Sequence, residues 1–213
     1  MDGKKLLLEE QLDFLREMMS IGAGNANTAL SQLLQCSVEM VIPEIHICTA
    51  PKVTEILDNP SLPVAGVRME MVGNVRGRLF FVVPDKHKND FIEIAEKAMF
   101  GKKKEGNHKD LSVLEEFGNI LAGVYLTTIH DFCKLNIYHS VPTLAIDMIQ
   151  SLLDESILDM ACEAPTVIFI VNQFFIVEKN INTFFLIIPT MDSLKILLDS
   201  IKEAREIYGF KKD

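Results

Sequence analysis

The spacing of apolar residues predicts two long amphipathic helices, one from about Glu9 to Gln35 and one from about Lys109 to Lys134. In the second helix the core-facing residues recur every three to four positions, as in a helix with one face against a core. These residues are Val113, Leu114, Phe117, Ile120, Leu121, Val124, Thr128 and Phe132. Each helix leads into a strand-like run that contains a proline, at residues 38–50 and 137–149.

The elements that follow also come in pairs. Short helices are expected at residues 51–58 and 150–160. Runs rich in β-branched and aromatic residues predict strands at 64–71 and 77–84, and again at 165–179 and 183–189. A charged amphipathic helix closes each half, at 85–100 and 191–210. The chain therefore has the order helix, strand, short helix, strand, strand, helix, and then repeats it.

This repetition predicts the domain organisation. A period of about 100 residues is too long for a solenoid and indicates a duplicated half-domain. We predict a single α/β domain over residues 1–213, with repeats at about 9–100 and 109–208 and a linker at about 101–108. The sheets of the two halves are expected to join about a pseudo-two-fold axis.

A row of polar residues, Ser112, Glu116 and Asn119, follows one side of the second predicted helix. Positions i, i+4 and i+7 fall within an arc of about 60°, so the three side chains share a face. The apolar stripe lies roughly opposite, and this second polar row should therefore face solvent. Pro142 follows Asn119 by 23 residues (142 − 119).

The first helix carries the matching first polar row, Asp13, Glu17 and Ser20, and Pro43 follows Ser20 by the same 23 residues (43 − 20). The two copies differ at the last position of the row, where Ser20 stands in place of asparagine. A surface row of this kind is usually a solvated helix face. Its presence in both halves favours a functional role instead.

Charge and composition narrow the classes of partner. With 21 Lys and Arg against 30 Asp and Glu, the net charge is −9, so a nucleic-acid partner is not expected. The one lysine-rich run, residues 102–104, is followed at once by Glu105. No signal peptide and no run of about 18–20 apolar residues is found, which predicts a cytoplasmic protein without a membrane span. An acidic surface suits a protein partner with positive charge around its site.

The cysteines, the histidines and the glycines near residue 22 indicate no disulfide, metal site or nucleotide site. Four dispersed cysteines, with no C-x-x-C pair, predict neither a disulfide framework nor a zinc site; they are Cys36, Cys48, Cys133 and Cys162. The five histidines lack metal-binding spacing. Gly22 and Gly24 do not form a dinucleotide loop, because the pattern around them is helical and the third glycine is missing. They are expected to permit close helix packing.

A glutamate and an asparagine on a helix surface are poor catalysts alone, since no nucleophile or metal cluster accompanies them. They make sense as groups that complete an active site on another molecule. A carboxamide both donates and accepts hydrogen bonds, so Asn119 can hold a water in line for attack on a phosphoryl group. Glu116, one turn away, can pair with a partner's lysine and fix the docking. Ser20 is shorter, lacks the NH₂ group, and should position a water badly.

The pattern [D/S]-x3-E-x2-N-x22-P, present twice, resembles the signature of the CheC family, which comprises the CheC, CheX and FliY phosphatases of chemotaxis. Ser112, Glu116, Asn119 and Pro142 match it fully. In the first copy Asp13, Glu17 and Pro43 match but Ser20 does not, so that site is expected to be degenerate. The resemblance covers residues 10–208. It is strongest to CheC, because no extra flagellar-switch domain is found.

The resemblance implies an extended antiparallel sheet with both long helices on one face. It also implies a phosphatase for the aspartyl phosphate of a CheY-type response regulator. Asn119 would orient the attacking water, Glu116 would contact the regulator's lysine, and Ser112 and Pro142 would contribute to docking. No cofactor is expected on this chain, since Mg²⁺ would be held by the regulator.

The CheD deamidase is a further partner implied by the resemblance, with the surface around Asp147 as the candidate contact. The alternative is a non-catalytic adaptor of the same fold that binds CheD or a flagellar-switch component. A small-molecule hydrolase has no support in the sequence, because no set of convergent polar groups for a pocket was found.

Overall fold

The computed structural model describes residues 9–49, 59–101, 111–163 and 166–208. In the first half of the chain it contains α1 (Glu9–Leu34), β1 (Val38–Met40), β2 (Glu44–Thr49), β3 (Pro63–Gly73), β4 (Gly77–Pro84) and α3 (Asp85–Phe100). The second half contains α4 (Ser112–Cys133), β5 (Ile137–His139), β6 (Thr143–Met148), α5 (Ile149–Glu163), β7 (Thr166–Ile176), a 3₁₀ turn η3 (Val177–Lys179), β8 (Ile181–Pro189) and α6 (Met191–Tyr208). The short helix predicted at 51–58, the lysine run at 102–104 and all but the first residue of the linker lie outside the described residues.

Most predicted elements are present, with two corrections. The strand predicted at 165–179 ends at Ile176, where a 3₁₀ turn follows. The runs at 38–50 and 137–149 were each predicted as one strand, and each is two strands, broken at residues 41–43 and 140–142. Proline has no N–H to donate to a ladder, so Pro43 and Pro142 interrupt the pairing. Each break inserts one extra residue relative to the neighbouring strand, and the chain then continues along that same strand.

The strands form one antiparallel sheet in the order β1-β7-β8-β4-β3-β5, with β2 also on β7 and β6 also on β3. The two halves therefore exchange strands: β1 and β2 pair with the second half, and β5 and β6 pair with the first. The registers match as well. Val38 lies opposite Ile176, and at the equivalent place Ile137 lies opposite Gly73. This is the predicted pseudo-two-fold arrangement, while the exact bounds of the two repeats stay a prediction.

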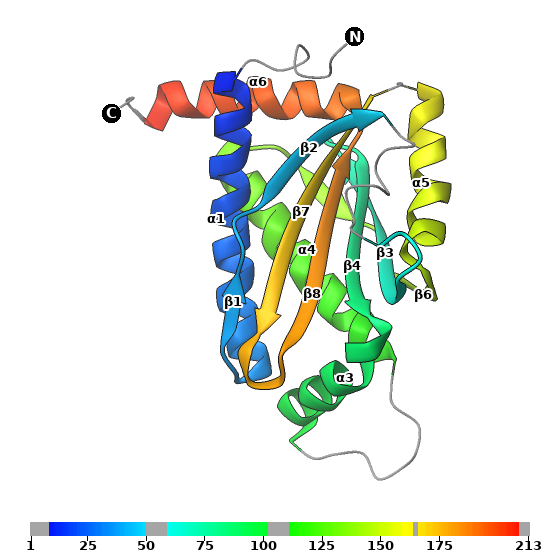
Figure 1. The fold of residues 1–213 in the computed structure, drawn as a ribbon. Helices are drawn as coiled ribbons and strands as arrows, with labels where there is room; N and C mark the ends of the chain where they lie inside the picture. The colour runs from blue at the N-terminus through cyan, green and yellow to red at the C-terminus, as the bar shows by residue number, and fades with distance from the viewer. Residues whose placement is uncertain (1–8, 50–58, 102–110, 164–165, 209–213) are drawn as a thin grey trace.

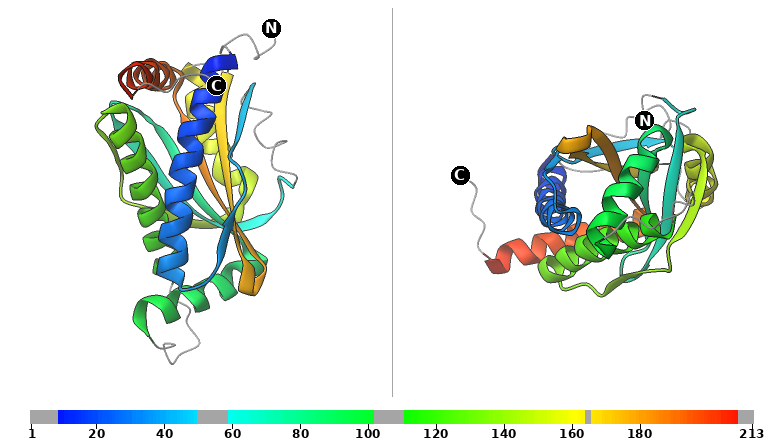
Figure 2. Two further views of the ribbon diagram at one scale, coloured as in Figure 1. Left: turned by 90° about the vertical axis from the view of Figure 1, so that its left-hand side faces the viewer. Right: turned by 90° about the horizontal axis from the view of Figure 1, so that it is seen from below.

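Helices cover both faces of the sheet (Figure 1). The two long helices, α1 and α4, lie side by side on one face together with α3 and α6, and α5 lies on the other (Figure 2). Alternate residues of a strand point to opposite faces, so Phe81 enters the core under α1 and α4 while Phe80 enters the smaller core under α5. Both long helices thus display their outer sides on the same face of the molecule.

The contact between α1 and α4 is close at Gly22. A Cβ atom at Gly22 would lie 3.0 Å from Cδ1 of Tyr125, so a larger residue would push the helices apart. Nearby, Asn25 Nδ2 donates a hydrogen bond to Thr128 Oγ1 at 3.0 Å. The predicted packing role holds for Gly22 but not for Gly24, which has nothing within 4 Å of an added Cβ.

Tyr125, stacked on Phe185 at a ring-centroid distance of 4.9 Å, has a buried hydroxyl with no hydrogen-bond partner among the described residues. Burial raises the pKa of Tyr125 well above the model-compound value of 10.0. Replacing Tyr125 by phenylalanine keeps the stack and removes an unsatisfied group. The free energy of unfolding at pH 7.5 should therefore stay the same or rise by about 1 kcal/mol.

The same change should reduce the sensitivity to alkali. Because the folded-state pKa is raised, the unfolded chain releases the Tyr125 proton first, and the wild type loses stability as pH rises above about 10. Urea unfolding at pH 7.5 and pH 10.5 measures both effects. Tyr138→Phe, at a tyrosine that is 63% exposed, is the matched control and should change neither value. A clear loss of stability in Tyr125→Phe at pH 7.5 would mean that the hydroxyl has a partner.

Candidate functional site

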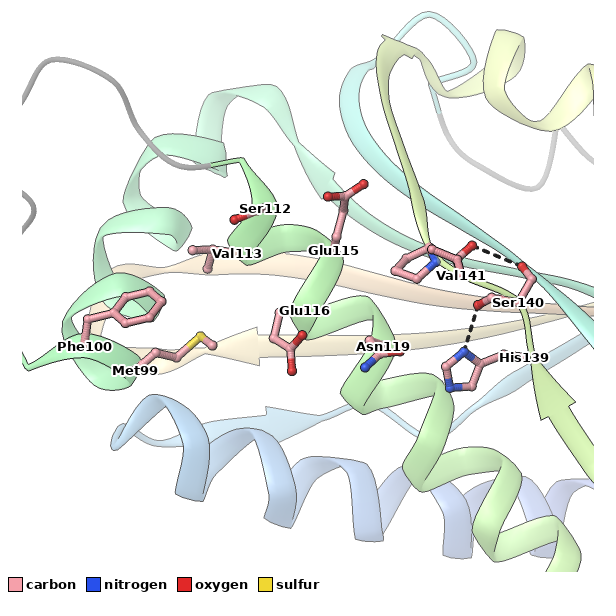
Figure 3. Close-up of a pocket in the computed structure, with 11 residues that line it drawn as sticks. Met99, Phe100, Ser112, Val113, Glu115, Glu116, Asn119, His139, Ser140 and Val141 are labelled. Carbon is pink, nitrogen blue, oxygen red and sulfur yellow. Dashed lines mark hydrogen bonds between the residues drawn. The ribbon is translucent and has the colours of Figure 1, made fainter.

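A cleft of about 660 Å³ runs along the first turns of α4, between the end of α3 and the connection from β5 to β6 (Figure 3). Its walls hold every member of the second polar row and the signature proline. The lining residues are Met99, Phe100, Ser112, Val113, Glu115, Glu116, Asn119, His139, Ser140, Val141 and Pro142. Four residues that the sequence picked out by spacing are therefore brought together in space.

The second polar row points outward, as predicted. Ser112 and Glu116 are exposed and Asn119 is half-buried, whereas Phe117, between the last two, is fully buried. Within the described part of the chain, neither Glu116 nor Asn119 makes a hydrogen bond or an ion pair. The carboxylate and the carboxamide are thus available to a group that enters from outside.

The opposite wall is held in place by backbone hydrogen bonds. Ser140 N donates to the carbonyl of Glu70 at 2.9 Å, and Glu70 N donates to Ser140 Oγ at 3.0 Å. Leu144 N donates to Glu115 Oε1 at 3.3 Å, which joins the start of β6 to α4. These bonds fix the position of Pro142 relative to the helix that carries the second polar row.

The first polar row has the same exposure pattern on α1: Asp13 and Glu17 are exposed and Ser20 is half-buried. Asp13 forms an exposed ion pair with Arg16 at 3.1 Å. Pro43 is buried. None of these four signature positions lines the cleft, so the structure keeps the two copies apart.

Asp147 lies on β6, away from the cleft, and is exposed. Its Oδ1 accepts a hydrogen bond from the Met148 backbone N–H at 2.7 Å. Ile146 and Met148 on either side are also about half exposed, so Asp147 lies in an exposed strip of β6, although its side chain points to the opposite face from theirs.

Sequence reasoning missed several residues of the cleft. Met99 and Phe100 come from the end of α3, and Val141, 84% exposed, stands directly before Pro142. His139 was considered only as a metal ligand. The sequence places His139 three residues before Pro142, which was the available signal that it belongs to the site. Only the packing of β5 beside α4 shows that this position lies in the cleft. The cleft therefore combines two carboxylates (Glu115 and Glu116), one carboxamide and an apolar rim, a surface that fits a protein with a cationic group.

The described residues include no group of three or more His, Cys, Asp or Glu side chains placed to hold a metal ion. Within the described residues, Cys36, Cys48 and Cys133 form no disulfide. Among the helices that the structure describes, none is both long enough and apolar enough to cross a membrane.

Comparison with known proteins shows similarity both in sequence and in fold. The CheC-like family matches residues 110–146, a range that contains the second polar row and Pro142. The chain is 35% identical over 155 residues to the CheY-P phosphatase CheC of Bacillus subtilis (strain 168), a match that spans 72% of this chain and 74% of that protein.

Solved structures show the same fold at lower identity. The crystal structure of FliY from Thermotoga maritima has a TM-score of 0.70 at 18% identity, over 93% of this chain and 98% of that one. The FliM middle domain from H. pylori has a TM-score of 0.60 at 13% identity, over 91% of this chain and 99% of that one.

Proposed function

The chain belongs to the CheC-like family, and on this premise we propose that it is a phosphatase acting on the aspartyl phosphate of a CheY-type response regulator in chemotaxis. The observation that carries the proposal is the convergence of Glu116, Asn119 and Pro142 in one open cleft. An exposed carboxylate and an unpaired carboxamide, one helical turn apart, are suited to a phosphoryl group that is presented by another protein.

In the proposed complex, the first turns of α4 enter the regulator's active site. Asn119 holds a water through its carboxamide, in line with the bond between phosphorus and the aspartate oxygen. Glu116 pairs with the regulator's lysine and fixes the approach of the helix. Ser112 and Pro142 contribute contact surface at the two edges of the cleft. Mg²⁺ belongs to the regulator, where it neutralises phosphoryl charge, and this chain supplies no ligand to it.

The first polar row is proposed to be catalytically degenerate. The last residue of this row is Ser20, whose side chain is shorter than that of Asn119 and ends in a hydroxyl instead of a carboxamide. A water held by Ser20 would therefore lie too far from the phosphorus. One active site per chain follows from this proposal. Asp13, Glu17 and Pro43 are the signature residues that this first copy still carries.

Docking is tested by reversing the charge at Glu116. In Glu116→Lys, an ammonium group would face the regulator's lysine, which we expect to cost about 2 kcal/mol or more and to raise KM for the phosphorylated regulator by at least about 30-fold. The control is Glu17→Lys, the equivalent residue of the first polar row and equally exposed. It should leave KM within about twofold. Equal effects of the two changes would indicate general charge repulsion instead of a specific contact.

The alternative is an adaptor that binds CheD or a flagellar-switch component without catalysis. The structural similarity to the FliM middle domain and the exposed strip around Asp147 favour it. The two functions are separated by following loss of phosphate from a phosphorylated CheY-type regulator with and without the wild-type chain. Faster loss supports the phosphatase. Binding of the regulator without any acceleration would support the adaptor.

A further inference from the structure

His139 stands beside the second polar row, although it belongs to a strand. Residues of β5 alternate in exposure: Ile137 is buried in the core under α4, Tyr138 is exposed on the opposite face, and His139 is half-buried. Successive side chains of a strand point to opposite faces, so His139 points to the same side as Ile137, towards α4. Its imidazole lies next to Asn119 in the cleft (Figure 3).

The hydrogen bonding of His139 determines which ring nitrogen is free. Nδ1 lies 3.0 Å from the backbone carbonyl oxygen of Ser140. A carbonyl can only accept, so in the neutral ring Nδ1 carries the hydrogen and Nε2 carries the lone pair. Nε2 is on the far side of the ring from Ser140 (Figure 3). Two residues that line the same cleft thus offer a hydrogen-bond acceptor, Asn119 through its amide oxygen and His139 through Nε2.

The first half of the chain shows what happens to this position in the degenerate copy. Met40 is the equivalent of His139, since both stand at the end of their short strands and three residues before the signature proline. The exposure pattern of β1 is identical to that of β5. Where the carboxamide of Asn119 is replaced by Ser20, the imidazole is therefore replaced by a thioether. The two polar groups are present together in one copy and absent together from the other.

We propose that His139 is a second catalytic residue of the phosphatase, which accepts a hydrogen bond from the attacking water while Asn119 accepts the other. This inference rests on the proposed function. A water that donates both hydrogens to the protein directs an oxygen lone pair at the phosphorus. The water oxygen then bonds to phosphorus, and the bond to the aspartate oxygen breaks with its electron pair left on the carboxylate. Both hydrogens leave on inorganic phosphate, so no other group has to gain or lose a proton.

The test uses two substitutions of His139 in the full chain, with a phosphorylated CheY-type regulator as substrate. His139→Met reproduces the residue of the first copy and removes the acceptor, so kcat should fall about tenfold with KM within about twofold. His139→Gln can place an amide oxygen near the position of Nε2. It should keep at least about half of kcat.

His130→Met is the matched control, because Nδ1 of His130 also lies near a backbone carbonyl, that of Leu135 at 2.8 Å, but the ring lies outside the cleft. It should not change kcat. Equal melting temperatures of all variants establish that folding is intact.

The proposal is overturned if His139→Met keeps the wild-type kcat, if only KM changes, or if His139→Gln is as slow as His139→Met. A wild type that does not accelerate dephosphorylation overturns the proposed function and this inference together. Loss of activity in Asn119→Ala but not in His139→Met overturns this inference alone.

Discussion

Replacing Asn119 by alanine is expected to slow dephosphorylation of the regulator by at least about 100-fold, while binding of the regulator changes by no more than about twofold. Removal of one preorganised hydrogen-bonding group at a reacting centre typically costs a factor of 10²–10³. Asn119 is half-buried in the cleft and makes no hydrogen bond within the described part of the chain, so its truncation should leave the fold intact. The docking contacts proposed for Glu116 and Pro142 remain in the variant.

Two measurements establish this result: single-turnover loss of phosphate, and titration of the regulator activated with beryllofluoride. Ser20→Ala is the matched control, at the equivalent position of the first polar row, and should leave the rate unchanged. Ser20→Asn restores the signature of the first copy and should raise the rate by less than twofold, because Met40 still occupies the place of His139 there. A rate in Asn119→Ala equal to that of the wild type would remove the second polar row from the mechanism.

The second large effect concerns stability. Phe117→Ala should lower the free energy of unfolding by about 3–5 kcal/mol. Phe117 is fully buried on the inner side of α4, directly after Glu116, and its ring meets the ring of Phe91 edge-on at 5.1 Å. Phe91 in turn packs against Phe81 at 5.6 Å. The three rings join α4, α3 and the sheet, and the cavity left by one of them cannot be filled without moving the others.

Guanidinium unfolding measures the loss, and the melting temperature should fall by about 10 °C for a chain of this length. Phe117→Leu, which leaves a smaller cavity, should cost less than half as much. Leu158→Ala, on the exposed side of α5, is the surface control and should cost less than about 0.5 kcal/mol. A loss below about 1 kcal/mol in Phe117→Ala would show that the aromatic cluster contributes little to stability.

Local pattern was sufficient to predict the elements and the second polar row. The apolar stripe of the second helix determines which side of α4 is buried, and the spacing of Glu116 and Asn119 then places both on the outer side. The elements and their buried sides depend on periodicity within a single element, which the sequence displays directly. That α1 and α4 lie on one face of an antiparallel sheet was implied by the resemblance to the CheC family.

Features that depend on contacts between distant elements could not be obtained in this way. The breaks at residues 41–43 and 140–142 needed the pairing of the sheet, although the prolines marked them. His139 becomes part of the site only because β5 pairs with β3 and faces α4, and no pattern within β5 indicates either contact. Met99 and Phe100 reach the cleft because α3 ends beside the start of α4. Whether the site residues act as proposed stays a prediction.

The exchange of strands between the two halves has a consequence for how this gene can evolve. His139 and Pro142 flank the break between β5 and β6, and both of these strands pair with β3, which is encoded in the first half. Deleting the first half would leave the second without the strand that positions one wall of its cleft. The backbone of the first half is therefore needed for the cleft of the second half, whatever side chains stand in the first polar row.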